Sequence, residues 1–167
     1  MIRLGRSEDV TAIRGVERSA GQAFTMIGLR AVAEDVPPSR EELAGYIDAG
    51  RIWVTVNENG RPVAYILVRQ VEKMAHIEQV SVAPEHARRG LGAALIDHVE
   101  EWARGQELNG LTLTTFAEVP WNAPYYERLG FRQIPPDALS DGLRVIREHE
   151  AAVGLDRWPR TAMFRAL

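Results

Sequence analysis

The sequence predicts an α/β fold of the α+β kind, with a mixed, mostly antiparallel sheet flanked by helices. Chain length, strand patterning and one long amphipathic segment support this prediction. The 167 residues can build one good core but not two, so we expect a single domain over residues 1–167. Strand-like segments follow one another in the first half, and a helical stripe at Leu91, Leu95, Val99 and Trp102 comes after them.

The predicted elements begin and end at residues that favour a boundary. Ser39 and Glu42 form a capping box for the second helix, which Gly50 closes. An Asn-Gly turn near residue 60 separates the first two strands of an antiparallel meander. The expected elements are a strand at 2–4, helices at 10–17 and 39–50, strands at 51–56, 63–71 and 74–82, a helix from 91, a strand at 111–116, a helix at 122–129, an extended segment from 130, a helix at 143–153 and a strand at 161–164.

Composition excludes several classes of protein. A net charge of −3 gives no general attraction to nucleic acid or to an anionic membrane, and we expect neither as a partner. The absence of cysteine excludes disulfides, thiolate catalysis and cysteine-ligated zinc. The histidines have no paired metal-ligand spacing, so we expect no metal site. No apolar run is long enough to span a membrane, and the cytoplasm is the expected location.

The most informative segment is residues 80–95, where a predicted strand leads through a turn into a helix. Free backbone N–H groups at a helix N-terminus favour an anion, and the helix dipole adds to this preference. Gly90 and Gly92 let phosphate groups approach the backbone, and Arg88 and Arg89 add positive charge. The segment therefore predicts a pyrophosphate site.

Two other nucleotide-binding motifs contain similar glycines, but this segment matches neither of them. The dinucleotide-binding fingerprint requires a third glycine where Leu95 stands, and the P-loop requires a Lys-Ser/Thr pair that is absent. The two glycines could also serve tight helix packing alone. On these residues by themselves, both anion binding and packing remain open.

Two motifs resemble the GNAT family of N-acetyltransferases. Residues 87–92 resemble its motif A, Gln/Arg-x-x-Gly-x-Gly/Ala, except that Ala87 replaces the first residue. Residues 125–131, an aromatic-Tyr-Glu-Arg-Leu-Gly-Phe run, resemble its motif B. The asparagine that the family carries upstream of this run is replaced by Val119, and Asn122 lies closer in. The resemblance covers residues 51–131 and extends loosely to both ends.

This resemblance implies an acetyl-CoA-dependent N-acetyltransferase whose acceptor is a primary amine of a small molecule or peptide. It implies a sheet of about six to seven strands that splays near Val80, and it leaves room for a homodimer. In the family, backbone N–H groups bind the pantetheine arm and the pyrophosphate. The residues carried over as contacts to acetyl-CoA are Val80, Ser81, Val82, Arg88, Arg89, Gly90, Leu91, Gly92, Ala93, Asn122 and Tyr126.

Alternation along the third long strand places His76 and Glu78 on one face. The resemblance implies a carboxylate on this strand as the general base, so Glu78 is our first candidate and His76 the reserve. It also implies that Tyr126 donates a proton or a hydrogen bond to the departing thiolate. The plainer alternatives are exposure or an ion pair for Glu78 and His76, and an aromatic core position for Tyr126.

Some questions stay open in the sequence. A non-catalytic acyl-CoA sensor and a nucleotide-binding protein are rival readings of the same glycines. The resemblance places the acceptor pocket in residues 21–38, whose pattern does not identify the amine. Charged pairs such as Glu100–Glu101 and Arg147–Glu148 are interpreted as solvated helix faces.

Overall fold

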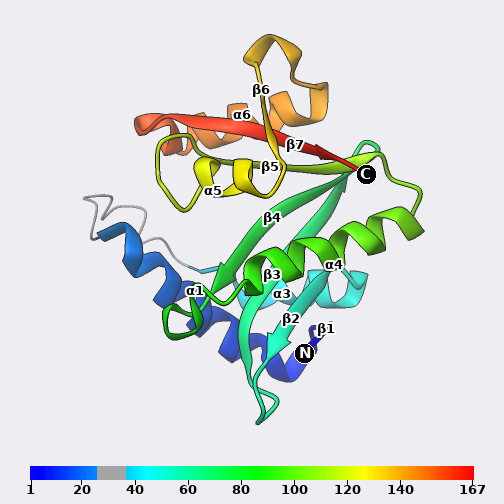
Figure 1. The fold of residues 1–167 in the computed structure, drawn as a ribbon, viewed down its shortest axis with the longest axis vertical. Coiled ribbons are helices and arrows are strands. Elements are labelled where there is room, and N and C mark those ends of the chain that lie inside the picture. Colours follow the sequence, from blue (N-terminus) through cyan, green and yellow to red (C-terminus); the bar gives the residue numbers. More distant parts are fainter. Residues whose placement is uncertain (26–36) are drawn as a thin grey trace. The chain divides into compact units, whose positions relative to one another are not determined.

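The computed structural model describes residues 1–25 and 37–167 (Figure 1). The centre of the predicted acceptor segment, residues 26–36, lies outside the described residues. The elements are β1 (Ile2–Leu4), η1 (Ser7–Asp9), α1 (Val10–Thr25), α3 (Arg40–Ala49), β2 (Ile52–Val56), β3 (Pro62–Val71), β4 (Met74–Val82), η2 (Pro84–His86), α4 (Leu91–Gly105), β5 (Gly110–Phe116), α5 (Ala123–Arg128), β6 (Arg132–Ile134), η3 (Pro136–Ala138), α6 (Asp141–Ala152), η4 (Leu155–Arg157) and β7 (Arg160–Ala166).

The strands form one seven-stranded sheet in the order β1-β2-β3-β4-β5-β7-β6. β4 and β5 pair in parallel, while β1 with β2, β2 with β3, β5 with β7 and β6 with β7 pair antiparallel. The prediction of a mixed, mostly antiparallel sheet with flanking helices is therefore confirmed. The chain contacts divide into two compact units. Unit 1 comprises Met1–Val68 and Gln79–His98, and unit 2 comprises Arg69–Glu78 and Val99–Leu167. The single-domain assignment stays a prediction.

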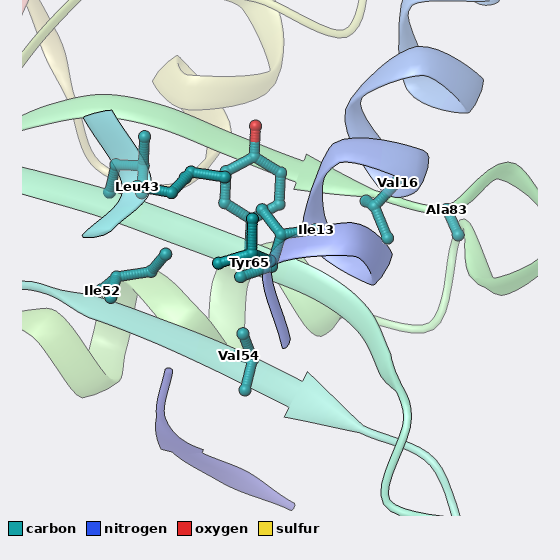
Figure 2. Close-up of a cluster of buried hydrophobic side chains, with 9 residues drawn as sticks. Ile13, Val16, Leu43, Ile52, Val54, Tyr65 and Ala83 are labelled. Carbon is teal, nitrogen blue, oxygen red and sulfur yellow. The ribbon is translucent and has the colours of Figure 1, made fainter. Parts of the chain in front are cut away.

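The core of unit 1 is built around Tyr65, which is fully buried on β3. Figure 2 shows its ring beside Ile13 of α1 and Leu43 of α3, with Val54 of β2 below it. Burial of such side chains contributes about 1.5–3 kcal/mol each to folding. The cluster consists of Val10, Ile13, Val16, Leu43, Ile52, Val54, Tyr65, Leu67 and Ala83.

The predicted boundaries of α3 are confirmed by its hydrogen bonds. The backbone N–H of Glu42 donates to the Ser39 hydroxyl at 3.0 Å, and the Ser39 N–H donates to the Glu42 carboxylate at 3.5 Å. Gly50 ends the helix in the left-handed region at φ 68°, which a residue with a Cβ rarely adopts. Local sequence therefore determines this helix at both ends.

Unit 2 is organised around the antiparallel pair β5 and β7, with β6 on the far edge of β7. α6 lies between β6 and β7 in the sequence, and Figure 1 shows it (orange) beside β7 (red). Ser140 caps its start by accepting a hydrogen bond from the Leu143 N–H at 3.3 Å. None of the helices in the described part of the chain has the length and apolarity that a bilayer crossing requires.

Candidate functional site

The predicted pyrophosphate segment forms a tight turn in unit 1. After η2, Arg88 and Gly90 adopt left-handed conformations at φ 63° and 75°, and α4 begins at Leu91. The Ala94 N–H donates to the Gly90 carbonyl at 3.0 Å, which closes the first helical turn. The N–H groups of residues 91–93 therefore have no acceptor within the helix. Left-handed residues before a helix N-terminus direct successive N–H groups into one concavity, which suits an anion.

Glycine is favoured at position 90 by the backbone conformation, with φ at 75°, and not by crowding. A Cβ at this position would meet no atom within 4 Å. The space beside the Gly90 Cα is therefore open. Arg88 pays the steric cost of a left-handed conformation without being glycine, about 1–2 kcal/mol. Backbone strain at Arg88 and an uncrowded Gly90, both just before a helix, are features that favour an anion-binding function.

The two arginines of this loop lie on the surface. Both are exposed, and the Arg89 Nη1 lies 3.4 Å from the His86 Nδ1. They add positive charge beside the helix N-terminus, and neither forms an ion pair with a carboxylate among the described residues. Their contribution is a general attraction for anions, since exposed charges are screened by salt.

The predicted contact of Ser81 to acetyl-CoA needs only its backbone N–H, and its side chain is bonded within unit 1. It is buried, and its hydroxyl donates to the Glu17 carboxylate at 2.6 Å. The Tyr65 hydroxyl donates to the same carboxylate at 2.6 Å, and the Gln79 amide lies 3.3 Å from it. Burial and then the charge of Glu17 raise the pKa of Tyr65 well above its usual value, so the phenol stays protonated. This cluster of neutral donors around Glu17 was not anticipated from the sequence.

Glu78 lies on the part of β4 that belongs to unit 2, and it forms an ion pair. Its Oε1 is 3.0 Å from the Arg69 Nε on β3, with 31% of the Glu78 side chain exposed. Burial raises the pKa of Glu78, although the charge of Arg69 opposes this shift. The plain alternative of an ion pair is thus present, together with the raised pKa that favours a proton acceptor.

His76 is enclosed more completely than Glu78. It is 2% exposed, and its Nδ1 is 2.8 Å from the Thr112 hydroxyl of β5. Burial, aided by the charge of Arg69, lowers the pKa of His76 to about 4, so the ring is neutral near pH 7. Its enclosure leaves little room for an acceptor amine, and these observations favour Glu78 over His76 as the base.

Asn122 is the N-cap residue of α5 in unit 2, and Tyr126 lies in the middle of this helix. Tyr126 is 8% exposed and stacks edge-on against Tyr125 and Phe131, with ring centres 5.2 and 5.8 Å away. Burial and then the neighbouring Tyr125 raise the pKa of Tyr126. The Asn122 Oδ1 is buried and accepts no hydrogen bond from the described residues. A buried carbonyl oxygen without a donor suits a ligand N–H, as the pantetheine arm provides.

Unit 2 contains an ionic cluster of Arg147, Glu150 and Arg160 that was not predicted from the sequence. Arg147 was interpreted as part of a solvated face, which is wrong: its side chain is 19% exposed and its Nη1 is 2.8 Å from the Glu150 Oε1. Arg160 pairs with the same carboxylate at 3.3 Å. The i, i+3 spacing of Arg147 and Glu150 could have indicated their ion pair. The local sequence does not indicate the second partner of Glu150, which is Arg160 on β7. Glu148 is exposed, as expected.

The described residues hold no group of three or more histidine, aspartate or glutamate side chains that could bind a metal ion. The predicted site residues fall in both units. The cofactor-binding candidates from Val80 to Ala93 belong to unit 1, whereas the candidate bases Glu78 and His76, together with Asn122 and Tyr126, belong to unit 2. The groups available are thus a helix start with free backbone N–H groups in one unit, and a carboxylate with a protonated phenol in the other.

A family model described as the acetyltransferase (GNAT) family matches residues 22–131. An uncharacterized N-acetyltransferase of Methanocaldococcus jannaschii is 28% identical over 96 residues, which cover 53% of this chain and 42% of that protein. The match thus spans less than half of this relative's length.

Solved structures show the same fold at low identity. An acetyltransferase of the GNAT family from Staphylococcus aureus Mu50 has a TM-score of 0.76 at 17% identity, covering 100% of this chain and 98% of that one. N-acetylglutamate synthase from Neisseria gonorrhoeae, solved with coenzyme A and N-acetyl-glutamate, has a TM-score of 0.75 at 18% identity, covering 100% of this chain and 35% of that one. At these identities the likeness shows a shared fold.

Proposed function

The chain belongs to the acetyltransferase (GNAT) family, and we propose that it transfers an acetyl group from acetyl-CoA to a primary amine of a small molecule or peptide by direct attack. The observation that carries the proposal is the left-handed turn at Arg88 and Gly90 that opens α4. Its free N–H groups would hold the diphosphate of coenzyme A, and the open space beside Gly90 admits it. The unsatisfied Asn122 Oδ1 would accept an N–H of the same donor molecule.

The reaction needs a proton acceptor for the amine. An alkylammonium of pKa near 10.4 titrates about 3.4 units above pH 7, so forming the neutral amine at pH 7 costs roughly 4.6 kcal/mol. We propose that the Glu78 carboxylate takes this proton as the amine nitrogen attacks the thioester carbonyl carbon. A C–N bond then forms and the C–S bond breaks. The electron pair of the C–S bond leaves with the thiolate, which takes up the second proton that the attacking nitrogen loses as it becomes an amide.

We propose that Tyr126 donates a hydrogen bond to the sulfur of the leaving group. Because its pKa is raised, the phenol remains protonated and is better suited to hydrogen bonding than to full proton transfer. The backbone N–H groups of Val80 to Val82 would polarise the acetyl carbonyl, a role that requires no particular side chain. The buried Ser81 hydroxyl, already bonded to Glu17, would take no part.

We also propose a cytoplasmic location and a homodimer, each with its own test. A cytoplasmic location is supported by the cysteine-free composition, and cell fractionation would test it. A homodimer is supported only by the family resemblance, and sedimentation analysis over a range of concentrations would test it.

Donor binding can be tested with two matched glycines. Gly90 and Gly60 both have left-handed φ values, 75° and 76°, and a Cβ at either would meet no atom within 4 Å. Gly90→Ala and Gly60→Ala should each lower stability by about 1 kcal/mol. Only Gly90→Ala should weaken coenzyme A binding, by about tenfold, because the ligand must then restore the left-handed turn.

Calorimetric titration with coenzyme A, ATP and NAD would measure this effect. Thiol release from acetyl-CoA with a panel of amines would test transfer itself. Binding of ATP or NAD in preference to coenzyme A, or equal affinity losses in the two variants, would contradict the donor site. Coenzyme A binding without acetylation of any amine would identify a sensor instead.

A further inference from the structure

Unit 2 contains a cavity that none of the proposed catalytic residues lines. It has a volume of about 450 Å³, within the range of small-molecule sites. It lies among the ends of β5, β6 and β7 and the segment that joins β6 to β7. Its lining residues are Ala117, Gln133, Ile134, Pro135, Pro136, Leu139, Arg147, Arg160, Thr161 and Ala162.

The charges on the cavity wall are of one sign. Arg147 and Arg160 both line it, and no acidic residue does. The remaining wall is mostly apolar, with Gln133 and Thr161 as further polar groups. An apolar cavity with a few convergent cationic groups is suited to a small molecule that carries a negative charge.

The acidic residues that neutralise these arginines lie behind the wall. Glu150, 12% exposed, accepts from Arg147 at 2.8 Å and pairs with Arg160 at 3.3 Å. The second partner of Arg147 is Asp156, at 2.9 Å and 41% exposed. Two guanidinium groups therefore share one buried carboxylate, and only a partly solvated aspartate offsets the remaining positive charge.

Both guanidinium groups retain donors for a ligand. Each carries five N–H bonds in a planar fork. Arg160 uses Nε and Nη2 for Glu150 and Thr114, so its Nη1 has no partner among the described residues. Arg147 uses Nη1 for Glu150 and Nη2 for Asp156, so its Nε–H has no acceptor among the described residues.

The cluster shares a sheet face with the proposed base. His76 of β4 is the register partner of Thr112 on β5, and Thr114 lies two residues further on the same face. The Thr114 hydroxyl donates to Glu150. The charge of Glu150 also contributes to the raised pKa of Glu78, after burial, while Arg69 opposes the shift. All of these residues belong to unit 2.

From this arrangement we propose that the cavity binds the acidic group of the acceptor, through Arg147 and Arg160, and that the acceptor is an amine bearing a carboxylate, such as an amino acid. This inference rests on the proposed acetyltransferase function. The acceptor amine would lie toward Glu78, and its carboxylate toward the arginines. Arg147 and Arg160 are then specificity-determining residues, and Glu150 positions their guanidinium groups.

The first test uses the wild-type protein alone. Acetylation rates are compared for L-amino acids and their α-carboxamides, which differ in the anionic group. The carboxamide has the less basic amine, so chemistry alone favours it. We expect kcat/KM to be at least about tenfold higher for the acids than for the amides. Equal rates, or faster acetylation of the amides, would overturn the inference while leaving acetyl transfer established.

The second test separates the cavity arginine from a neighbour on the same helix. Arg147→Gln should raise KM for the acids about tenfold, with little change for the amides or for acetyl-CoA. Arg144→Gln is the control, since Arg144 pairs with Asp141 at the surface and does not line the cavity. Arg160→Lys keeps the charge but loses the fork, and should show the same selectivity loss. Equal effects of Arg144→Gln and Arg147→Gln would contradict the assignment.

A binding measurement covers the case in which no amine is acetylated. The thermal midpoint of the wild-type protein is recorded with N-acetyl amino acids and with their carboxamides. Stabilisation by the acids only, lost in Arg147→Gln, supports the anion site even if the proposed transfer reaction fails. Absence of any difference between acids and amides overturns the inference independently of the reaction.

Discussion

The loop before α4 in unit 1 and the Glu150 cluster in unit 2 are both arranged to hold charge, yet they do so by different means. The loop offers backbone N–H groups, fixed by the left-handed turn at Arg88 and Gly90. The cluster offers side chains from β5, α6 and β7, which are distant in the sequence. A backbone site tolerates changes of side chain, whereas a cluster of side chains fails when one member is replaced.

The sharpest test of this difference is Glu150→Gln. It leaves two guanidinium groups without their shared carboxylate, and we expect a loss of about 3 kcal/mol in the free energy of unfolding at pH 7. Burial alone would raise the pKa of Glu150, but Arg160, Thr114 and Arg147 bring it below its usual value. The stabilisation is therefore present above the carboxyl's ordinary pKa and is lost as pH falls through the lower folded-state value.

Urea unfolding curves at several pH values would measure this effect. The difference between wild type and Glu150→Gln should shrink as the solution becomes acidic. Glu148→Gln, on the exposed side of the same helix, should change stability by less than about 0.5 kcal/mol. A pH-independent difference would show that the loss comes from packing and not from ionisation.

The next largest effect is expected at Glu78. Glu78→Gln should lower kcat about 100-fold while leaving the affinity for coenzyme A unchanged, because only proton removal is lost. Thiol release under saturating donor would measure the rate. If the variant keeps more than half of the wild-type rate, Glu78 is a structural partner of Arg69 and not the base.

The matched variant for Glu78 is Arg69→Gln, which keeps the Glu78 carboxylate but removes the cation that pairs with it. The rate should rise with pH as Glu78 deprotonates. Since Arg69 lowers the pKa of Glu78, its removal should shift that rise to higher pH. An unchanged pH profile would show that Glu78 is not the group whose ionisation controls the rate.

The smallest effect is expected in the loop. Arg89→Gln removes an exposed charge but no backbone donor, so coenzyme A affinity should fall by about threefold at most, and less at high salt. Calorimetry at two ionic strengths would measure it. A loss of tenfold or more would show that the loop also depends on its side chains, which would remove the contrast between the two regions.

The same contrast explains which parts of the molecule could be predicted. The capping box at Ser39, the β-meander and the helix from Leu91 follow from short-range patterns, and the structure has each of them. The loop at residues 87–92 was recognisable because its spacing is local. The family and the fold follow from those residues together with the motif at 125–131.

The remaining features depend on contacts between distant segments. Nothing near Glu17 indicates that Tyr65 and Ser81 would bond to it, since they are contributed by β3 and β4. Likewise, Arg160 of β7 pairs with Glu150 of α6 in the folded chain, and no local pattern indicates this contact. The pairing of Glu78 with Arg69 depends on strand register, which hydrophobic patterning alone does not determine.

The enclosure of Tyr126 has a consequence for how the proposed reaction would respond to alkaline conditions. A phenol with a raised pKa does not ionise in the range where alkylamines become neutral. Turnover would then climb toward a plateau at high pH without the descending limb that a titrating acid imposes. The ionisations of Glu78 and of the acceptor amine both raise the rate with pH, and neither would produce a falling limb.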